Sequence, residues 1–182
     1  TQTVKVSIAV PNGLKSGGYY ALITIKTGAT KSQGSGAGIS GQLGVPFLFT
    51  VEGEGKLVRS ATLERFAPIM ESDGRISFRA LVRGTGNVYV ETQGKVEVAG
   101  ANGKQMASLD FPNSGRILPS SDRLVQTQGS LPLPSGQTYT ATASLTYGDK
   151  GSRLTAAATF AVAPPALTIA KLGVCENLDK GP

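Results

Sequence analysis

The chain has 182 residues, of which 40% are hydrophobic and 16% charged, and it carries a formal net charge of +6 without a single histidine. The length is that of one large or two small globular domains. The absence of histidine excludes Ser-His-Asp and Cys-His catalysis and histidine metal sites. With 24 glycines and 10 prolines, and apolar runs that alternate instead of following a helical period, the sequence predicts an all-β protein.

The positive charge is dispersed along strands and turns, without the basic cluster that nucleic-acid binding requires, so no nucleic-acid partner is expected. The only cysteine, Cys175, rules out a disulfide within the chain. No apolar run approaches the roughly 18 residues of a membrane span. The chain begins with neither Met nor a leader, which indicates a mature or excised piece.

The first third contains three expected strands. Residues 3–10 (TVKVSIAV) alternate, with Val4, Val6, Ile8 and Val10 on one face. A second strand is expected over 19–26 and a third over 45–51, and the acidic, glycine-rich stretch 52–55 (EGEG) reads as a linker.

The remainder contains further alternating runs, with strands expected over 57–66, 75–83, 88–99, 105–111 and 123–128. The Asn102-Gly103 pair predicts a hairpin between the third and fourth of these. Residues 133–162 then comprise a turn, an alternating run, a Gly-Asp-Lys-Gly connection and a second alternating run. This order is typical of the closing hairpin of an immunoglobulin-like sandwich.

A weaker copy of that hairpin lies near the start of the chain. Residues 133–139 (LPSGQTY) and 14–20 (LKSGGYY) share the pattern Leu-x-Ser-Gly-x-x-Tyr, and each is followed by a Phe-x-Val strand. The repeat predicts tandem immunoglobulin-like β-sandwich modules, one complete and one partial. Residues 56–163 form the complete module, and 1–55 form the last part of an incomplete first one. Residues 164–182 form a linker and the first strand of a following module or, alternatively, a donor-type tail.

Several segments carry a family resemblance, namely 84–90 (GTGNVYV), 94–98 (GKVEV), 102–104 (NGK), 117–119 (ILP) and 131–148. Together they resemble the immunoglobulin-like (fibronectin type III or PapD-like) repeats of large prokaryotic cell-surface or secreted proteins. The resemblance implies a structural or adhesive role, an extracellular or cell-surface location and no family active site. It also implies a tyrosine corner, in which a tyrosine hydroxyl ties down the preceding turn, at Tyr139 and Tyr20.

The other motifs do not indicate a catalytic, metal or cofactor site. Residues 36–41 match G-x-G-x-x-G, but a strand follows them where a dinucleotide site needs a helix, so a glycine loop is the better interpretation. The 12 acidic residues form no pattern typical of a metal site or a catalytic pair. No catalytic residue, metal or cofactor is therefore expected. Two interpretations of Lys5 and Lys95 remain open. Either lysine forms an isopeptide cross-link to Asn87, or each is an ordinary exposed lysine on a strand.

Two main hypotheses follow. The first is a non-catalytic structural or adhesive module whose partners are other modules of the same or neighbouring chains. The second is an assembly subunit, a homo-oligomer, that completes its open sandwich by strand exchange. The segments expected to exchange contain the apolar residues Val4, Val6, Ile8, Val10, Leu167, Ile169 and Leu172. A weaker alternative is a module that binds cell-wall or surface polysaccharide, although the chain has no tryptophan, five tyrosines and six phenylalanines.

Overall fold

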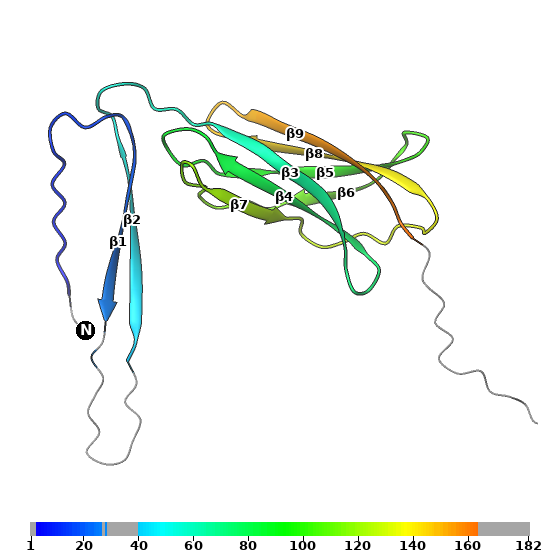
Figure 1. Cartoon of the computed structure of the whole chain (residues 1–182), viewed down its shortest axis with the longest axis horizontal. Coiled ribbons are helices and arrows are strands. Elements are labelled where there is room, and N and C mark those ends of the chain that lie inside the picture. The colour runs from blue at the N-terminus through cyan, green and yellow to red at the C-terminus, as the bar shows by residue number, and fades with distance from the viewer. Residues whose placement is uncertain (1–2, 27, 29–39, 164–182) are drawn as a thin grey trace, which may run out of the picture.

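The computed structural model describes residues 3–26, 28 and 40–163, and the regular elements among them are all antiparallel strands (Figure 1). No helix among these residues has the length and apolar character needed to cross a membrane. The predicted all-β fold is confirmed. The strands are β1 Gly17–Lys26, β2 Gln42–Val51, β3 Ala61–Met70, β4 Ile76–Gly84, β5 Thr92–Gly100, β6 Gln105–Phe111, β7 Asp122–Gln126, β8 Thr138–Tyr147 and β9 Ser152–Ala161.

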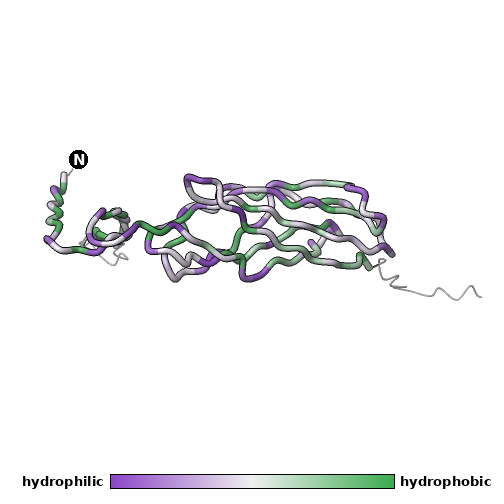
Figure 2. Tube along the Cα trace, turned by 90° about the horizontal axis from the view of Figure 1, so that it is seen from above, coloured by the Kyte–Doolittle hydropathy of each residue, from purple (hydrophilic) through white to green (hydrophobic). Residues whose placement is uncertain are grey.

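Strands β3 to β9 form a two-sheet sandwich. One sheet has the order β3-β4-β7 and the other the order β6-β5-β8-β9. Consecutive strands therefore change sheet between β4 and β5, between β6 and β7 and between β7 and β8. The two-stranded sheet β1-β2 is separate and stands at one end of the elongated sandwich in both views (Figure 1, Figure 2).

The core lies between the two sheets and is built by the alternation seen in the sequence. Strand β4 turns Ile76, Phe78, Ala80 and Val82 inward, and all four are buried. Four aromatic rings cross the core in a chain, from Phe66 on β3 through Phe78 on β4 to Phe160 on β9 and Tyr139 on β8, with successive ring centroids 5.8, 5.9 and 5.8 Å apart. These rings join the two sheets.

Several strand boundaries differ from the prediction. The strand expected over 88–99 begins only at Thr92, and β3 differs most. The strand expected over 57–66 begins at Ala61 and continues to Met70. The residues before it bond instead to the loop after β4, where Thr85 donates its N–H to Ser60 O at 2.8 Å. Pro68 lies inside β3, which is tolerated because β3 is the edge strand of its sheet.

The two predicted hairpins of the sandwich are confirmed. Asn102-Gly103 lies in the turn between β5 and β6, where Gly103 adopts a φ of 74° that a side chain would strain. Strands β8 and β9 pair without interruption from Thr138–Ala161 to Tyr147–Ser152.

Candidate functional site

The β1-β2 hairpin presents a continuous apolar surface. Because paired residues of an antiparallel ladder point to the same side, the pairs Tyr19–Phe49, Ala21–Phe47, Ile23–Val45 and Ile25–Leu43 share one face. We call these eight residues the apolar hairpin face. The Phe47 and Phe49 rings stack on it with their centroids 6.1 Å apart. Five of its members, Tyr19, Ala21, Ile25, Leu43 and Val45, are exposed, so the face is incompletely covered.

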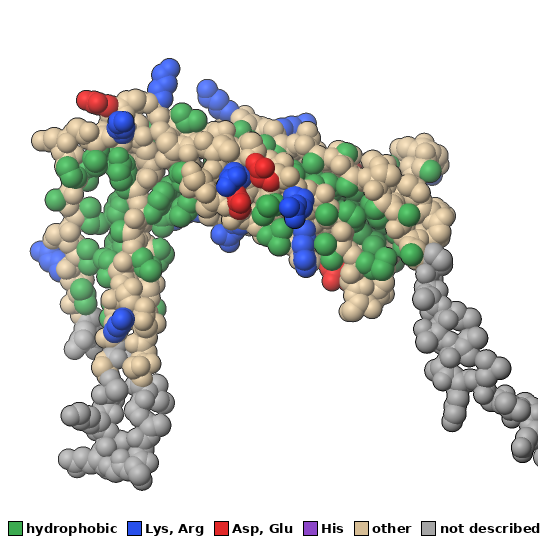
Figure 3. Space-filling model, viewed as in Figure 1, with side chains coloured by type: hydrophobic (Ala, Val, Ile, Leu, Met, Phe, Trp, Pro, Cys, Tyr) green, Lys and Arg blue, Asp and Glu red, His purple; other side chains and the backbone are tan. Residues whose placement is uncertain are grey.

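Residues 3–10 lie beside this hairpin, on the side away from the sandwich, in both views (Figure 1, Figure 2). The predicted strand over these residues is wrong, since they form no ladder with any described strand. Apolar alternation selects a face, but a strand also needs a hydrogen-bonding neighbour. The strand-exchange candidates Val4, Val6, Ile8 and Val10 are all exposed. Figure 3 shows apolar side chains gathered along this segment and the hairpin.

The base of the hairpin is closed by Ser16, which is buried. Its Oγ lies 2.9 Å from the carbonyl oxygen of Gly53 and 3.0 Å from that of Gly55, and it accepts the Gly53 N–H at 3.0 Å. A Cβ at position 53 would lie 1.8 Å from the carbonyl oxygen of Leu14, so only glycine fits there. Residues 52–55, which the sequence indicates as a linker, therefore form hydrogen bonds with Ser16 that close the base of the hairpin.

Asn87 joins this base to the sandwich. Its Oδ1 accepts the Val58 N–H at 2.7 Å, and its Nδ2 donates to the carbonyl oxygens of Ser16 at 2.9 Å and Lys56 at 2.8 Å. Its own carbonyl oxygen accepts the Gly18 N–H at 2.7 Å. One side chain from the loop between β4 and β5 thus bonds both to the hairpin base and to the connecting segment. We call the contacts of Ser16 and Asn87 the joint.

A cleft of about 610 Å³ separates the other face of the hairpin from the sandwich. The side chains of Leu22 and Leu48 belong to that hairpin face by register, and Arg116, Leu118 and Arg123 line the cleft from the sandwich. The hairpin therefore contacts the sandwich mainly at its base, which leaves the joint to determine its orientation.

The two candidate corner tyrosines differ. The Tyr139 hydroxyl donates to the Pro134 carbonyl oxygen at 2.8 Å, the bond that defines a tyrosine corner. Tyr20 makes no such bond: its hydroxyl is buried beside the Tyr89 backbone without completing a hydrogen bond. Burial raises the pKa of Tyr20, and the Tyr89 backbone offsets part of that rise.

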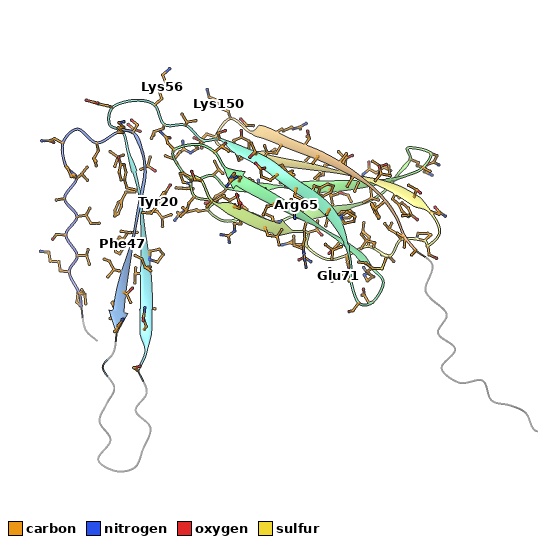
Figure 4. The ribbon with its side chains drawn as sticks, viewed as in Figure 1. Tyr20, Phe47, Lys56, Arg65, Glu71 and Lys150 are labelled. Atoms are coloured by element: carbon orange, nitrogen blue, oxygen red, sulfur yellow. The ribbon has the colours of Figure 1, made fainter. Side chains whose placement is uncertain are left out.

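The corner-type bond near the start of the chain belongs to Tyr19 instead. Its hydroxyl donates to the Lys15 carbonyl oxygen at 2.9 Å, and Lys15 is the residue that corresponds to Pro134 in the repeat. The assignment to Tyr20 is corrected for a simple reason. Strand alternation turns Tyr20 toward the sandwich and its neighbour Tyr19 toward the turn. Figure 4 labels Tyr20 on the hairpin.

Other sequence candidates are placed as follows. Leu167, Ile169, Leu172 and Cys175 lie outside the described residues, as does most of the glycine motif at 36–41. The Asn87 amide is occupied by backbone partners, and Lys95 pairs with Glu97. Within the described ranges, no three Cys, Asp or Glu side chains gather in a manner that would hold a metal ion.

Sequence reasoning missed Ser16 as a functional residue and considered Asn87 only for a cross-link. Ser16 belongs to the repeated Ser-Gly pattern, and the pattern gives no sign that the serine meets residues far along the chain. The one available signal was the Gly-Thr-Gly-Asn turn, because asparagine there is a typical side-chain-to-backbone bonding residue.

Comparisons with protein-family models, with curated proteins and with solved structures find no match for this chain. The function is therefore inferred from the sandwich and the joint alone.

Proposed function

We propose that the chain is a non-catalytic structural or adhesive part of an extracellular surface protein, and that its joint holds neighbouring β units in a fixed orientation. The observation that carries this proposal is the joint, in which Asn87 bonds to the hairpin base and to the connecting segment. A spacer transmits position only if its connections are stiff, and a hydrogen-bonded connection with a required glycine is stiffer than a free polar linker. The partners are then other modules of the same or neighbouring chains.

The stiffness of the joint can be measured by the distance between two spin labels. Thr24 on β1 and Lys104 in the β5-β6 turn are both exposed, so cysteines there accept labels once Cys175 is replaced by serine. We expect pulsed electron paramagnetic resonance to give a narrow distribution of the distance between the two labels. A distribution as broad as that of a free glycine-rich linker would contradict the proposal.

The apolar hairpin face supports a second candidate function, an assembly subunit that completes its open β unit with a strand from another copy. Strands β1 and β2 pair only with each other among the described strands. Unpaired edges beside an exposed apolar face favour the addition of a strand. The proposed donor is residues 166–174 of a second copy, whose sequence contains Leu167, Ile169 and Leu172.

A charge placed on the apolar hairpin face tests this second candidate. Leu43 is 62% exposed and Leu124, on the outer surface of β7, is 57% exposed, so Leu43→Glu and Leu124→Glu should cost similar, small amounts of stability, within about 0.5 kcal/mol. We expect Leu43→Glu and deletion of 166–182 each to convert oligomers to monomers in light scattering, while Leu124→Glu leaves them intact. A wild-type chain that is monomeric at all concentrations would exclude strand exchange.

A further inference from the structure

The β1-β2 hairpin repeats the pairing of the β8-β9 hairpin. Each begins with a tyrosine paired directly with a phenylalanine, Tyr19 with Phe49 and Tyr139 with Phe160. Counting along the strands from these pairs gives three further equivalences, namely Ala21 with Ala141, Ile23 with Ala143, and Ile25 with Leu145. The sandwich therefore shows which neighbours a hairpin of this kind has when its sheet is complete.

One neighbour of β8 has no counterpart at the β1-β2 hairpin. In the sandwich β8 lies between β9 and β5, and its inward residues from Tyr139 to Leu145 are fully buried. In the hairpin β1 pairs with β2 alone among the described strands, and Tyr19 and Ile25 are exposed. The edge of β1 that corresponds to the β5 side of β8 therefore carries no strand in the described part of the chain. An unpaired edge beside an apolar face is a site for an added strand.

The other edge of the hairpin is less suited to an added strand. Pro46 lies within β2, opposite Leu22, and a proline has no N–H to donate to a neighbour. Strand β1 contains no proline from Gly17 to Lys26. Strand β2 also corresponds to β9, which is itself the edge strand of its sheet. Both observations favour β1 as the strand that accepts a neighbour.

A second copy of the β5 sequence pattern identifies the segment that fits this edge. Residues 92–99 read TQGKVEVA and residues 168–175 read TIAKLGVC, so threonine, lysine and valine recur at the first, fourth and seventh positions. The inward residues Val96 and Val98 of β5 are fully buried against the core. Leu172 and Val174 occupy the same two positions of the pattern. The segment therefore has the apolar spacing that β5 uses beside β8.

One position of the pattern differs and limits its length. Ala170 stands where β5 has Gly94, and a Cβ at Gly94 would lie 2.0 Å from the carbonyl oxygen of Ser144. An added strand can therefore follow the β5 register only from residue 171 onward. That register pairs Val96 with Ala143 and Val98 with Ala141, so it places Leu172 opposite Ile23 and Val174 opposite Ala21.

The position of β9 shows that the donor must come from a second copy. Strand β9 begins at the end of the sandwich next to the hairpin, and Ala161 lies at the opposite end (Figure 1). Its 10 residues are about 33 Å long, whereas the stretch from residue 163 to residue 171 spans at most about 29 Å. The tail of one chain is thus too short to return to its own β1.

We propose that residues 171–175 of one copy add to β1 of the next copy as an antiparallel strand, in the register that β5 has on β8. The inference rests on the second candidate function and deepens it, because it assigns the accepting edge, the direction and the register. Residues 20–24 accept the strand, which leaves the Gly18 bond to Asn87 in place. Donor and acceptor are different surfaces at opposite ends, so the contact is head-to-tail and can continue into a linear polymer.

Disulfide trapping in the 182-residue chain tests the register. In a Cys175→Ser background, Ala21→Cys and Val174→Cys place two thiols directly opposite each other, within the reach of a disulfide. Under air oxidation we expect covalent dimers and longer species on non-reducing gels, which reductant removes. The control combines Thr24→Cys with Val174→Cys in the same background. Thr24 lies on the opposite side of β1 from Ala21, so this pair should give little cross-linking.

Two aspartate variants test the apolar contact by light scattering. Leu172→Asp should weaken assembly by about tenfold or more, because it places a charge against Ile23. Leu167→Asp adds the same charge before the paired segment and should have a smaller effect. Equal cross-linking of the two cysteine pairs, or equal effects of the two aspartates, would overturn the register while oligomers still support strand exchange. A chain that is monomeric at all concentrations would exclude both.

Discussion

Replacing Asn87 with alanine is expected to release the hairpin from its fixed orientation while leaving the sandwich folded. The change removes the bonds to Val58 N–H and to the carbonyl oxygens of Ser16 and Lys56. Among the hydrogen bonds of the described residues, the main-chain bond from Gly18 N–H to the residue 87 carbonyl oxygen then remains between the hairpin base and the sandwich. Most of the freed groups can reach water, so the free energy of unfolding should fall by only about 1–2 kcal/mol.

The effect on geometry should exceed the effect on stability. With spin labels at positions 24 and 104, the distance distribution of Asn87→Ala should broaden markedly relative to the parent chain. Asn102→Ala is the matched control, because it also removes an asparagine bond, from Lys104 N–H to Oδ1 at 3.0 Å, but at a turn outside the joint. Equal widths for Asn87→Ala and the parent would show that Asn87 does not set the orientation.

Much of the sandwich could be predicted from the sequence because its strands have one buried and one exposed face. The alternation in 75–83 reflects that geometry, and β4 buries Ile76, Phe78, Ala80 and Val82. The turn before Tyr139 was predicted for a similar reason. The Leu-x-Ser-Gly-x-x-Tyr pattern places Tyr139 shortly after a turn, and the resemblance to immunoglobulin-like repeats implied the bond that its hydroxyl makes to the Pro134 carbonyl oxygen.

Pairing over long sequence distances could not be predicted in the same way. The alternation in 3–10 is as clean as in β4, yet no described strand pairs with it. Periodicity specifies which side chains share a face, but the neighbour that satisfies the backbone is chosen by the whole fold. Tyr20 fails for a related reason, since two adjacent tyrosines point to opposite sides and the motif alone does not say which of them faces the turn.

The joint lies furthest from sequence reasoning. Asn87 bonds to Ser16, 71 residues away. No local pattern relates such residues.

Phe78→Ala is expected to be among the most damaging substitutions in the sandwich. Phe78 is fully buried at 0% exposure and lies in the middle of the aromatic chain, with Phe66 on one side and Phe160 on the other. Its removal leaves a cavity between the two sheets and separates the ring of β3 from the rings of β8 and β9. Losses of this kind cost about 3–5 kcal/mol, a large share of the roughly 5–15 kcal/mol that stabilises a typical domain.

Urea unfolding followed by tyrosine fluorescence measures this loss, with Leu124→Ala as a surface control that should change the free energy of unfolding by no more than about 0.5 kcal/mol. Phe78→Leu should recover part of the loss because it refills part of the cavity. Spin labels at positions 24 and 104 distinguish this damage from damage at the joint. At urea concentrations where Phe78→Ala remains folded, its distance distribution should stay narrow, because Phe78 is not one of the residues whose hydrogen bonds form the joint. A distribution as broad as that of Asn87→Ala would mean that the sandwich core, and not the joint alone, holds the hairpin in place.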